Sequence, residues 1–270
     1  RRQRQMCIRD SLTTISLLQS FKPTIEFEDL TYNFVTDFEK FLYESGYQTN
    51  TVAKHMKHLK SFVNAAINKG YIDPNNYAFR RYKIKMKEGK HVFLLPEEMK
   101  KLEEVSLTGR NSCLEHTLDA FLFCCYTGLR YSDFVNLNEK NIVKMDGKLW
   151  LIFDSVKTGT EVKLPLNLLF EGKALTLLQK YQGKWSSFFS IKNNSSVNKE
   201  LIRIGKLAKI SKHFSFHSAR HTNATLLIYK GANITTVQKL LGHKNLATTQ
   251  IYGEVMGSTI IRDLKKCQKR

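Results

Sequence analysis

Apolar residues recur at helical spacing in two neighbouring segments near the start of the chain. Within residues 31–45 they fall on one face of a helix, at Phe34, Val35, Phe38, Phe41 and Leu42. A second helix is predicted after Thr49-Asn50, either of which could cap it, and Gly70 should end it. Its apolar positions are Val52, Met56, Leu59, Val63 and Ala66, and its other faces carry Lys54, His55, Lys57, His58 and Lys60. The pattern predicts a small helical domain with one basic side.

The apolar pattern lapses between residues 80 and 87, where few side chains can join a core. Basic residues dominate this stretch, at Arg80, Arg81, Lys83, Lys85 and Lys87. We interpret it as the basic part of a connection between two domains. The first domain is expected at 1–88, the linker at 89–92 and the second domain at 93–270. The second domain should open with a helix after Leu95, because Pro96 suits a first helical turn.

The second domain is predicted to be mostly helical, with one small β element. Residues 148–153 and 161–165 resemble two strands joined by a turn around Lys157-Thr158-Gly159-Thr160, and Asp146-Gly147 marks an earlier turn. The predicted C-terminal helices are Phe216 to Lys230 with Gly231 as its stop, Ile234 to Leu241 between Asn233 and Gly242, and Leu246 to Tyr252. The expected fold class is mainly α, with a small β-hairpin or sheet in the second domain.

The composition indicates a folded and strongly basic protein. Hydrophobic residues make up 42% of its 270 residues, which is enough to bury a sizeable core, and the formal net charge is +19. Such an excess of positive charge favours nucleic acid or an anionic membrane as partner. The membrane has little other support, because the longest strongly apolar run, Phe121 to Tyr126, is far too short to span a bilayer.

The cysteines argue against a disulfide framework and against a zinc site. There are five, no CxxC occurs, and Cys124 and Cys125 are adjacent in an apolar segment. This usage fits a reducing cytoplasm, and no secretory signal precedes the fold. The chain begins at Arg1 rather than methionine, which is typical of a fragment or processed form and leaves room for an upstream domain. No metal or other cofactor is expected.

The candidate chemistry lies in the second domain. His217 and Arg220 are three residues apart, which places both on one face of the predicted helix. His243 follows the glycine that ends the next helix, and Tyr252 stands nine residues later. With Arg130 upstream, the set supplies a nucleophile, proton carriers and two guanidinium groups. Such a set can transfer a phosphodiester without a metal ion.

Together these motifs resemble those of the tyrosine recombinase, or phage-integrase, family. The matching segments are Thr127-Gly128-Leu129-Arg130-Tyr131-Ser132-Asp133, His217-Ser218-Ala219-Arg220, Leu240-Leu241-Gly242-His243 and Thr248-Thr249-Gln250-Ile251-Tyr252. The resemblance is close over about residues 93–257 and looser over 31–75, which is similar to the family's helical core-binding domain. It implies a site-specific recombinase that cleaves and rejoins DNA through a 3′-phosphotyrosine intermediate and a Holliday junction, without ATP.

The resemblance also implies a role for each site residue. Tyr252 would be the nucleophile, while Arg130 and Arg220 would hold the non-bridging phosphate oxygens. Lys157, at the hairpin turn, would be the general acid for the leaving 5′-oxygen. The remaining assignments are His217 as general base or proton relay near Tyr252, His243 as hydrogen-bond donor to the phosphate, and Asp133 as an orienting residue.

Double-stranded DNA is the expected partner. Contacts are predicted from the second helix and from the basic stretch, at Lys54, Lys57, Lys60, Arg80, Arg81, Lys83, Lys85 and Lys87. The resemblance implies a homotetramer on paired recombination sites, with accessory DNA-bending or excision factors as further partners. Residues 258–270 carry an apolar stripe, Ile260, Ile261 and Leu264, which we predict docks on a neighbouring protomer.

Two other functions stay open at this point. A type IB topoisomerase uses similar chemistry but reseals the same two ends, so strand exchange between DNA molecules separates the activities. A DNA-binding accessory protein without catalysis would share the basic charge but has no need of six filled catalytic positions. Among recombinases, an integrase of a mobile element is favoured over dimer resolution or inversion, acting in a bacterial cytoplasm at the nucleoid.

Overall fold

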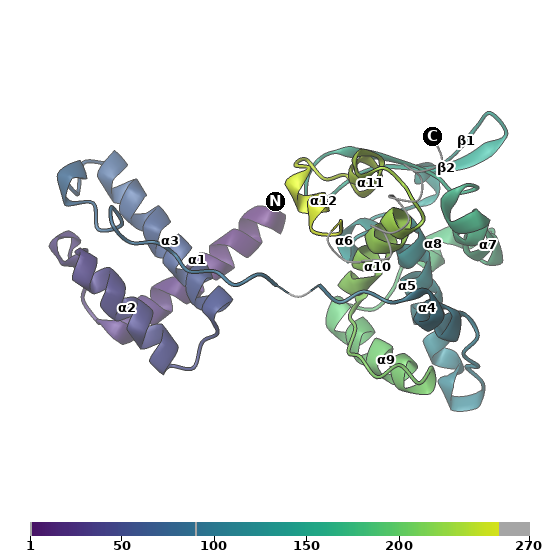
Figure 1. The fold of residues 1–270 in the computed structure, drawn as a ribbon, viewed down its shortest axis with the longest axis horizontal. Helices are drawn as coiled ribbons and strands as arrows, with labels where there is room; N and C mark the ends of the chain where they lie inside the picture. Colours follow the sequence, from purple (N-terminus) through teal and green to yellow (C-terminus); the bar gives the residue numbers. More distant parts are fainter. Residues whose placement is uncertain (1, 90, 254–270) are drawn as a thin grey trace, which may run out of the picture. The chain divides into compact units, whose positions relative to one another are not determined.

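The computed structural model describes residues 2–89 and 91–253, with side chains from Ser11 onward (Figure 1). The chain divides into two compact units, Arg1–Lys90 and His91–Arg270, and each is described by itself. The tail at 258–270, for which we predicted docking on a neighbouring protomer, lies outside the described residues. Among the described residues, no helix has the length and apolar character needed to cross a membrane.

The first unit is helical throughout its described secondary structure. Its elements are α1 (Arg2–Phe21), η1 (Phe27–Asp29), α2 (Tyr32–Glu44), α3 (Thr49–Asn68) and η2 (Pro74–Asn76). Both predicted apolar stripes are confirmed, because all their residues are buried except Phe41, which packs half-buried against the same core. Helix α1 was not predicted, since Leu18 is the one buried hydrophobic residue among its described side chains.

The basic stretch that we interpreted as part of a linker is attached to the first unit as far as Lys87. The side-chain amide of Asn50 donates to the Lys87 carbonyl and accepts from the Lys87 N–H, both at 2.9 Å. Tyr82 and Ile84 pack against the core of the unit, and the charges around them obscured these two positions in the sequence. The N-cap of α3 is Gln48, so the predicted cap was wrong.

His55, which we predicted on the basic side of α3, faces the core instead. It is 3% exposed, and its Nδ1 lies 2.9 Å from the hydroxyl of Thr14 in α1. Nδ1 of His58 lies 2.8 Å from the same hydroxyl. The buried Thr14 therefore joins α1 to α3 through a polar contact, which a helical apolar pattern does not reveal.

The second unit is mostly helical with one small sheet, as predicted. Its helices are α4 (Pro96–Glu103), η3 (Gly109–Leu114), α5 (Glu115–Thr127), α6 (Tyr131–Phe134), η4 (Glu139–Asn141), η5 (Leu169–Gly172), α7 (Lys173–Lys180), α8 (Trp185–Phe189), α9 (Asn194–Leu207), α10 (Phe216–Tyr229), α11 (Ile234–Leu241) and α12 (Ala247–Gln250). As predicted, α4 carries proline at its first turn, and Asn233 and Gly242 bound α11.

The sheet is an antiparallel meander in the order β1-β2-β3. Its strands are β1 (Ile142–Met145), β2 (Lys148–Asp154) and β3 (Glu161–Pro165). Strands β2 and β3 confirm the two predicted segments, and the predicted turn at Asp146-Gly147 joins β1 to β2. Strand β1 was missed because four residues are too few to show an alternating pattern. The β2–β3 loop carries Lys157.

Helix α5 is buried on nearly all sides. Of its 13 residues, 11 are buried, and it packs against α10, α7 and α9. It ends at Gly128, whose φ of 73° is left-handed. A Cβ at Gly128 would lie 2.6 Å from Cδ2 of Leu241 and 2.8 Å from Oδ1 of Asn223. Glycine therefore allows both the turn and the close approach of α10 and α11 to the end of α5.

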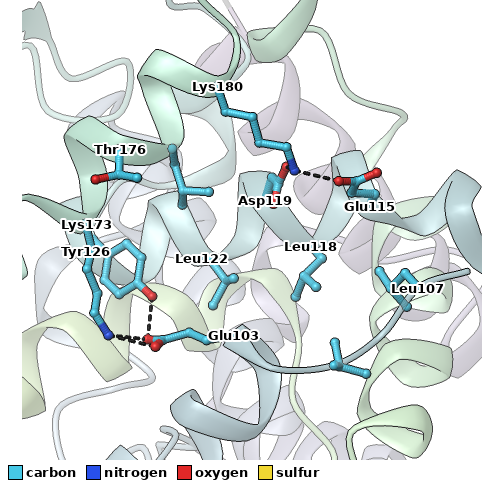
Figure 2. A pocket seen from close by; sticks show the side chains of 12 residues that line it. Glu103, Leu107, Glu115, Leu118, Asp119, Leu122, Tyr126, Lys173, Thr176 and Lys180 are labelled. Atoms are coloured by element: carbon cyan, nitrogen blue, oxygen red, sulfur yellow. Dashed lines mark hydrogen bonds and ion pairs between the residues drawn. The ribbon is translucent and has the colours of Figure 1, made fainter.

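A groove of about 440 Å³ lies over α4, α5 and α7 (Figure 2). At one end the Lys173 ammonium contacts both carboxylate oxygens of Glu103, at 2.8 and 2.7 Å, and the Tyr126 hydroxyl donates to the same carboxylate. At the other end Lys180 bridges two carboxylates of α5. These charges pair with one another and connect the three helices, so the groove is held together by its own ion pairs.

We predict that Gly128→Ala destabilises the second unit more than Gly147→Ala does. The two glycines share a φ of 73°, but a Cβ at Gly147 meets nothing within 4 Å. Left-handed strain alone should cost Gly147→Ala about 1–2 kcal/mol. The clashes at Gly128 should add about 1–3 kcal/mol. Each kcal/mol lowers the Tm of a unit of this size by about 2–4 °C. Equal Tm shifts in thermal unfolding would contradict the packing argument.

Candidate active site

The predicted site residues meet where three helices of the second unit converge. These are the C-terminal end of α5, the first turns of α10 and the C-terminal end of α11. Helix α10 begins with a capping arrangement in which the N–H of Ser215 donates to Oγ of Ser218 at 3.1 Å. The i, i+3, i+4 spacing of His217, Arg220 and His221 then places all three side chains on one face of α10.

Arg220 is the buried centre of the site. It is 3% exposed, its Nη1 donates to the Gly128 carbonyl at 2.8 Å, and its Nη2 donates to the Leu241 carbonyl. Both acceptors stand at helix C-termini, where the helix dipole favours a cation. Burial, and then the like charge of Arg130, lower the pKa of Arg220 to about 9. The guanidinium therefore stays charged at neutral pH.

Arg130, just after α5, contacts a hydroxyl that was not among the predicted site residues. Its Nη1 donates to Oγ of buried Ser155 at 2.9 Å and lies 3.5 Å from Oδ2 of Asp133. Oδ1 of Asp133 accepts the N–H of Val156 at 2.9 Å. Asp133 thus contacts both Arg130 and the main chain at the start of the β2–β3 loop. Only the tertiary fold brings Ser155 to this place.

Lys157 is exposed in the β2–β3 loop. The N–H of Ser155 donates to the Thr160 carbonyl at 2.9 Å, which closes the base of the loop. The Thr158 hydroxyl donates to the Gly242 carbonyl at 3.3 Å. The tip of the loop is therefore tied to the turn after α11, so the lysine and that turn are held on the same side of the unit.

His243 is held by the left-handed turn that ends α11. Gly242 has a φ of 62°, and a Cβ there would lie 2.7 Å from a side chain of β3. Nδ1 of His243 lies 2.8 Å from the hydroxyl of buried Thr249. Burial, and then the charges of Arg220 and Arg130, lower the pKa of His243 to about 3. The imidazole is therefore neutral at neutral pH.

Tyr252 lies just beyond α12, which ends at Gln250 rather than continuing to Tyr252 as predicted. It is 5% exposed, and its hydroxyl lies 2.9 Å from Nδ1 of His221. Burial raises the pKa of the Tyr252 phenol above its usual value, and the charges of Arg220 and Arg130 offset part of that rise. The phenol is therefore protonated at neutral pH.

His221 was not predicted, because His217 was expected to be the histidine near Tyr252. His217 is exposed, and its ring centroid lies 4.6 Å from that of His221. Burial, and then His217 and His91, lower the pKa of His221 to about 3. Partial desolvation of the His217 ring by its neighbours, and then the charge of Arg220, lower the pKa of His217 too. The signal for His221 was present in the sequence, because it stands four residues after His217 and shares its helical face.

The residues predicted to bind DNA all lie in the first unit. Those of the basic stretch are all exposed, namely Arg80, Arg81, Lys83, Lys85 and Lys87. Lys57 of α3 is also exposed, and its Nζ lies 3.0 Å from Sδ of Met86 in that stretch. Lys54 and Lys60 are half-buried. The basic stretch therefore passes Lys57 at Met86.

The chemistry of the site in the second unit is that of an anion-binding centre beside a phenol. Arg130, Arg220 and Lys157 supply three cations, and neutral imidazoles adjoin them. In the part of the chain that the structure describes, no group of three or more His, Cys, Asp or Glu side chains is placed to hold a metal ion. Guanidinium groups can bind a phosphodiester while a phenol attacks it.

Known protein families and proteins match this chain over most of its length. Residues 92–257 match the phage integrase family, and residues 3–85 match the phage integrase SAM-like domain. The chain is 30% identical over 241 residues to the tyrosine recombinase XerC of Oceanobacillus iheyensis, covering 84% of this chain and 77% of that protein. It is 29% identical over 227 residues to a tyrosine recombinase of Thermosipho africanus, covering 80% of this chain and 75% of that protein.

Solved structures share the fold at lower sequence identity. A lambda integrase dimer bound to a COC′ core site gives a TM-score of 0.77 at 19% identity, covering 94% of this chain and 90% of that one. A XerH site-specific recombinase in a post-cleavage complex with a palindromic difH substrate gives 0.73 at 18% identity, covering 96% and 79%. At these identities the likeness concerns the fold alone.

We predict that acid destabilises the second unit through two of its histidines. The pKa values of His221 and His243 are about 3 in the folded unit, against an ordinary 6.5, so the unfolded chain binds more protons between those values. Above about pH 6.5 both histidines are neutral in the folded and the unfolded chain, so they cost no stability there. As pH falls from 6.5 toward 3, only the unfolded chain gains the protons, and the free energy of unfolding decreases. Thermal unfolding between pH 7 and 4 measures this loss.

Two variants isolate the contribution of His221 to this acid sensitivity. His221→Phe should flatten the pH dependence by part of the ~1.4 kcal/mol per pH unit that one histidine can contribute. His213→Phe, at an exposed position of the same unit, should leave the pH dependence as it is in the wild type. Equal slopes for the wild type and both variants would mean that His221 titrates normally in the folded unit.

Proposed function

The chain belongs to the phage integrase family of tyrosine recombinases, and from this membership we propose how its residues break and rejoin DNA. The enzyme is a site-specific recombinase. The observation that supports the residue roles is the convergence around buried Arg220. Arg130 and Tyr252 both lie close enough to Arg220 for their charges to act on one another, although more than a hundred residues separate Arg130 from Tyr252 in sequence.

Tyr252 is the proposed nucleophile. Its phenolic oxygen attacks the scissile phosphorus, forms a 3′-phosphotyrosine bond and releases a 5′-hydroxyl. The phosphodiester energy is kept in the protein–DNA bond, so the reverse attack by a 5′-hydroxyl reseals the strand without ATP. Exchange of the attacking 5′-hydroxyls between two DNA molecules produces a Holliday junction.

Arg130 and Arg220 are the proposed ligands of the non-bridging phosphate oxygens. A guanidinium has five N–H donors, and Arg220 uses two side-chain nitrogens for the Gly128 and Leu241 carbonyls. Further N–H groups on the same fork can face a phosphate. Since the Arg220 fork is already oriented by main-chain acceptors, it needs little reorganisation to stabilise the charge that develops in the transition state.

The proposed proton carriers flank the arginines. Lys157 donates to the leaving 5′-oxygen from its exposed loop, and Asp133 orients Arg130 and that loop. His217, at the open side of the site, takes part in proton transfer. His243 donates to the phosphate through Nε2 in the tautomer in which its Nδ1 accepts the Thr249 hydroxyl proton, and the 2.8 Å contact between Nδ1 and that hydroxyl is compatible with this tautomer.

Double-stranded DNA is the proposed partner of both units. We assign residues 1–88 as the core-binding domain, 89–92 as the linker and 93–270 as the catalytic domain. Related folds were solved as a lambda integrase dimer on a core site and as a tetramer on a Holliday junction. We propose by analogy four protomers of this chain on paired sites, with accessory DNA-bending or excision factors. A mobile-element integrase acting at the bacterial nucleoid is the subtype that we favour.

The decisive test replaces the attacking oxygen alone. Tyr252→Phe should abolish covalent adduct formation on a nicked suicide substrate, while binding of the same DNA in a gel shift changes less than about twofold. A denaturing gel measures the adduct. Tyr229→Phe, at an exposed tyrosine of the same unit, is the matched control and should form adduct at the wild-type rate. An adduct formed by Tyr252→Phe would exclude Tyr252 as the nucleophile.

The basic stretch of the first unit should give DNA binding a steep dependence on salt. Replacing Arg80, Arg81, Lys83, Lys85 and Lys87 with glutamine should make the log–log slope shallower by about 0.9 for each phosphate that the stretch neutralises in the wild type. A control variant neutralises five exposed lysines of the second unit, Lys100, Lys101, Lys184, Lys206 and Lys209. Filter binding between 50 and 300 mM salt measures both slopes. An equal change in the two variants would mean that the stretch contributes only net charge.

A further inference from the structure

The hydroxyl of Ser155 lies between a cation of the site and its acidic neighbour. Ser155 follows directly after β2 and is 2% exposed. Its Oγ accepts a hydrogen bond from Nη1 of Arg130 at 2.9 Å, and the same oxygen lies 3.4 Å from each carboxylate oxygen of Asp133. A guanidinium can only donate, so the hydroxyl accepts from Arg130, and its own hydrogen is left for the carboxylate.

The contact with Ser155 engages one edge of the Arg130 fork. Among the described residues, the hydrogen bonds of the Arg130 side chain all run through Nη1, to Ser155 at 2.9 Å and to Asp133 at 3.5 Å. The contact with Asp133 is at the outer limit of a hydrogen bond, so Ser155 is the partner that fixes Nη1. Because a guanidinium is planar, a fixed terminal nitrogen restricts the rotation of the whole plane. Nη2 and Nε then remain for a phosphate.

The position of Ser155 is set by the main chain of the β2–β3 loop, which carries Lys157. The N–H of Ser155 donates to the Thr160 carbonyl at 2.9 Å, and its carbonyl accepts the N–H of Gly159 at 2.7 Å. Neither bond involves the side chain, so replacing the serine with alanine leaves both possible. The hydroxyl is therefore held by the loop independently of Arg130, and it gives the guanidinium a fixed partner.

We infer that Ser155 is a positioning residue, whose hydroxyl orients the Arg130 guanidinium for the phosphate. Without that hydroxyl, the partner of Nη1 in the described part of the chain is Asp133 at 3.5 Å. The guanidinium plane then rotates more freely, and its donors are less well aligned with the charge that develops in the transition state. Arg130 keeps its charge, so DNA binding changes little while the reaction slows. This inference rests on the proposed role of Arg130.

The first measurement is single-turnover adduct formation on saturating nicked DNA. Ser155→Ala should slow it by about ten- to a hundredfold, the effect of losing one hydrogen bond to a charged group, while gel-shift affinity changes less than about twofold. Thr117→Val removes another buried hydroxyl, which donates to Glu200 at the opposite end of α5 from the site, and should form adduct at the wild-type rate. Thermal unfolding checks that both variants fold. A wild-type rate in folded Ser155→Ala would overturn the inference.

A double-mutant cycle tests whether the hydroxyl acts through Arg130. Arg130→Lys keeps the charge but has a single terminal nitrogen, so no fork remains to be oriented. In that background Ser155→Ala should slow adduct formation less than about twofold, which a merely structural role would not produce. Equal slowing in both backgrounds would contradict the inference. Ser155→Cys places a weakly accepting thiol there, should react at a rate between serine and alanine, and serves in the cycle if Ser155→Ala does not fold.

A DNA substrate with sulfur in place of the leaving 5′-oxygen separates Ser155 from Lys157. A thiolate leaves without taking up a proton, so this substrate should restore adduct formation in Lys157→Ala but not in Ser155→Ala. Recovery of Ser155→Ala to the wild-type rate would mean that the hydroxyl acts through the loop of Lys157, and the inference would be wrong. Failure of the proposed function gives a different result, namely an adduct formed by Tyr252→Phe, whatever the Ser155 variants do.

Discussion

The buried guanidinium of Arg220 is the interaction on which the site depends. Its two terminal nitrogens join the Gly128 carbonyl at the end of α5 to the Leu241 carbonyl at the end of α11. Each of these helices ends in a left-handed glycine, Gly128 or Gly242. The chain can therefore turn away at once and leave the carbonyl facing Arg220. One side chain thus fixes two helix ends.

The two helix ends also position Arg130 and His243. Arg130 is the second residue after Gly128, and His243 is the next residue after Gly242. The left-handed turns direct both toward Arg220, which is why the charges of the two arginines act on the His243 pKa. The cost of this geometry is a concentration of positive charge in a partly buried place. A bound phosphate would compensate that charge, so the site is arranged for an anion before one arrives.

Local signals in the sequence predicted the elements of the site well, and contacts across the fold were harder to predict. Helix α11 was predicted with both of its boundaries, because Asn233 and Gly242 act through neighbouring main-chain atoms. Ser155 was missed, since its contact with Arg130 joins positions 25 residues apart. His221 was missed for another reason: a pattern that already contained His217 offered no local reason to prefer the second histidine. Burial and the contact with the Tyr252 hydroxyl distinguish His221 from His217.

Asp133 shows how such contacts affect the interpretation of sequence variants. Its carboxylate touches Arg130 with one oxygen and holds the Val156 N–H with the other, so two parts of the site share a single anchor. Loss of that anchor would disturb Arg130 and the loop of Lys157 together. Double-mutant cycles that pair Asp133 with Arg130 or with Lys157 should therefore be strongly non-additive. A natural variant at this position would resemble a change at both Arg130 and Lys157 while altering neither.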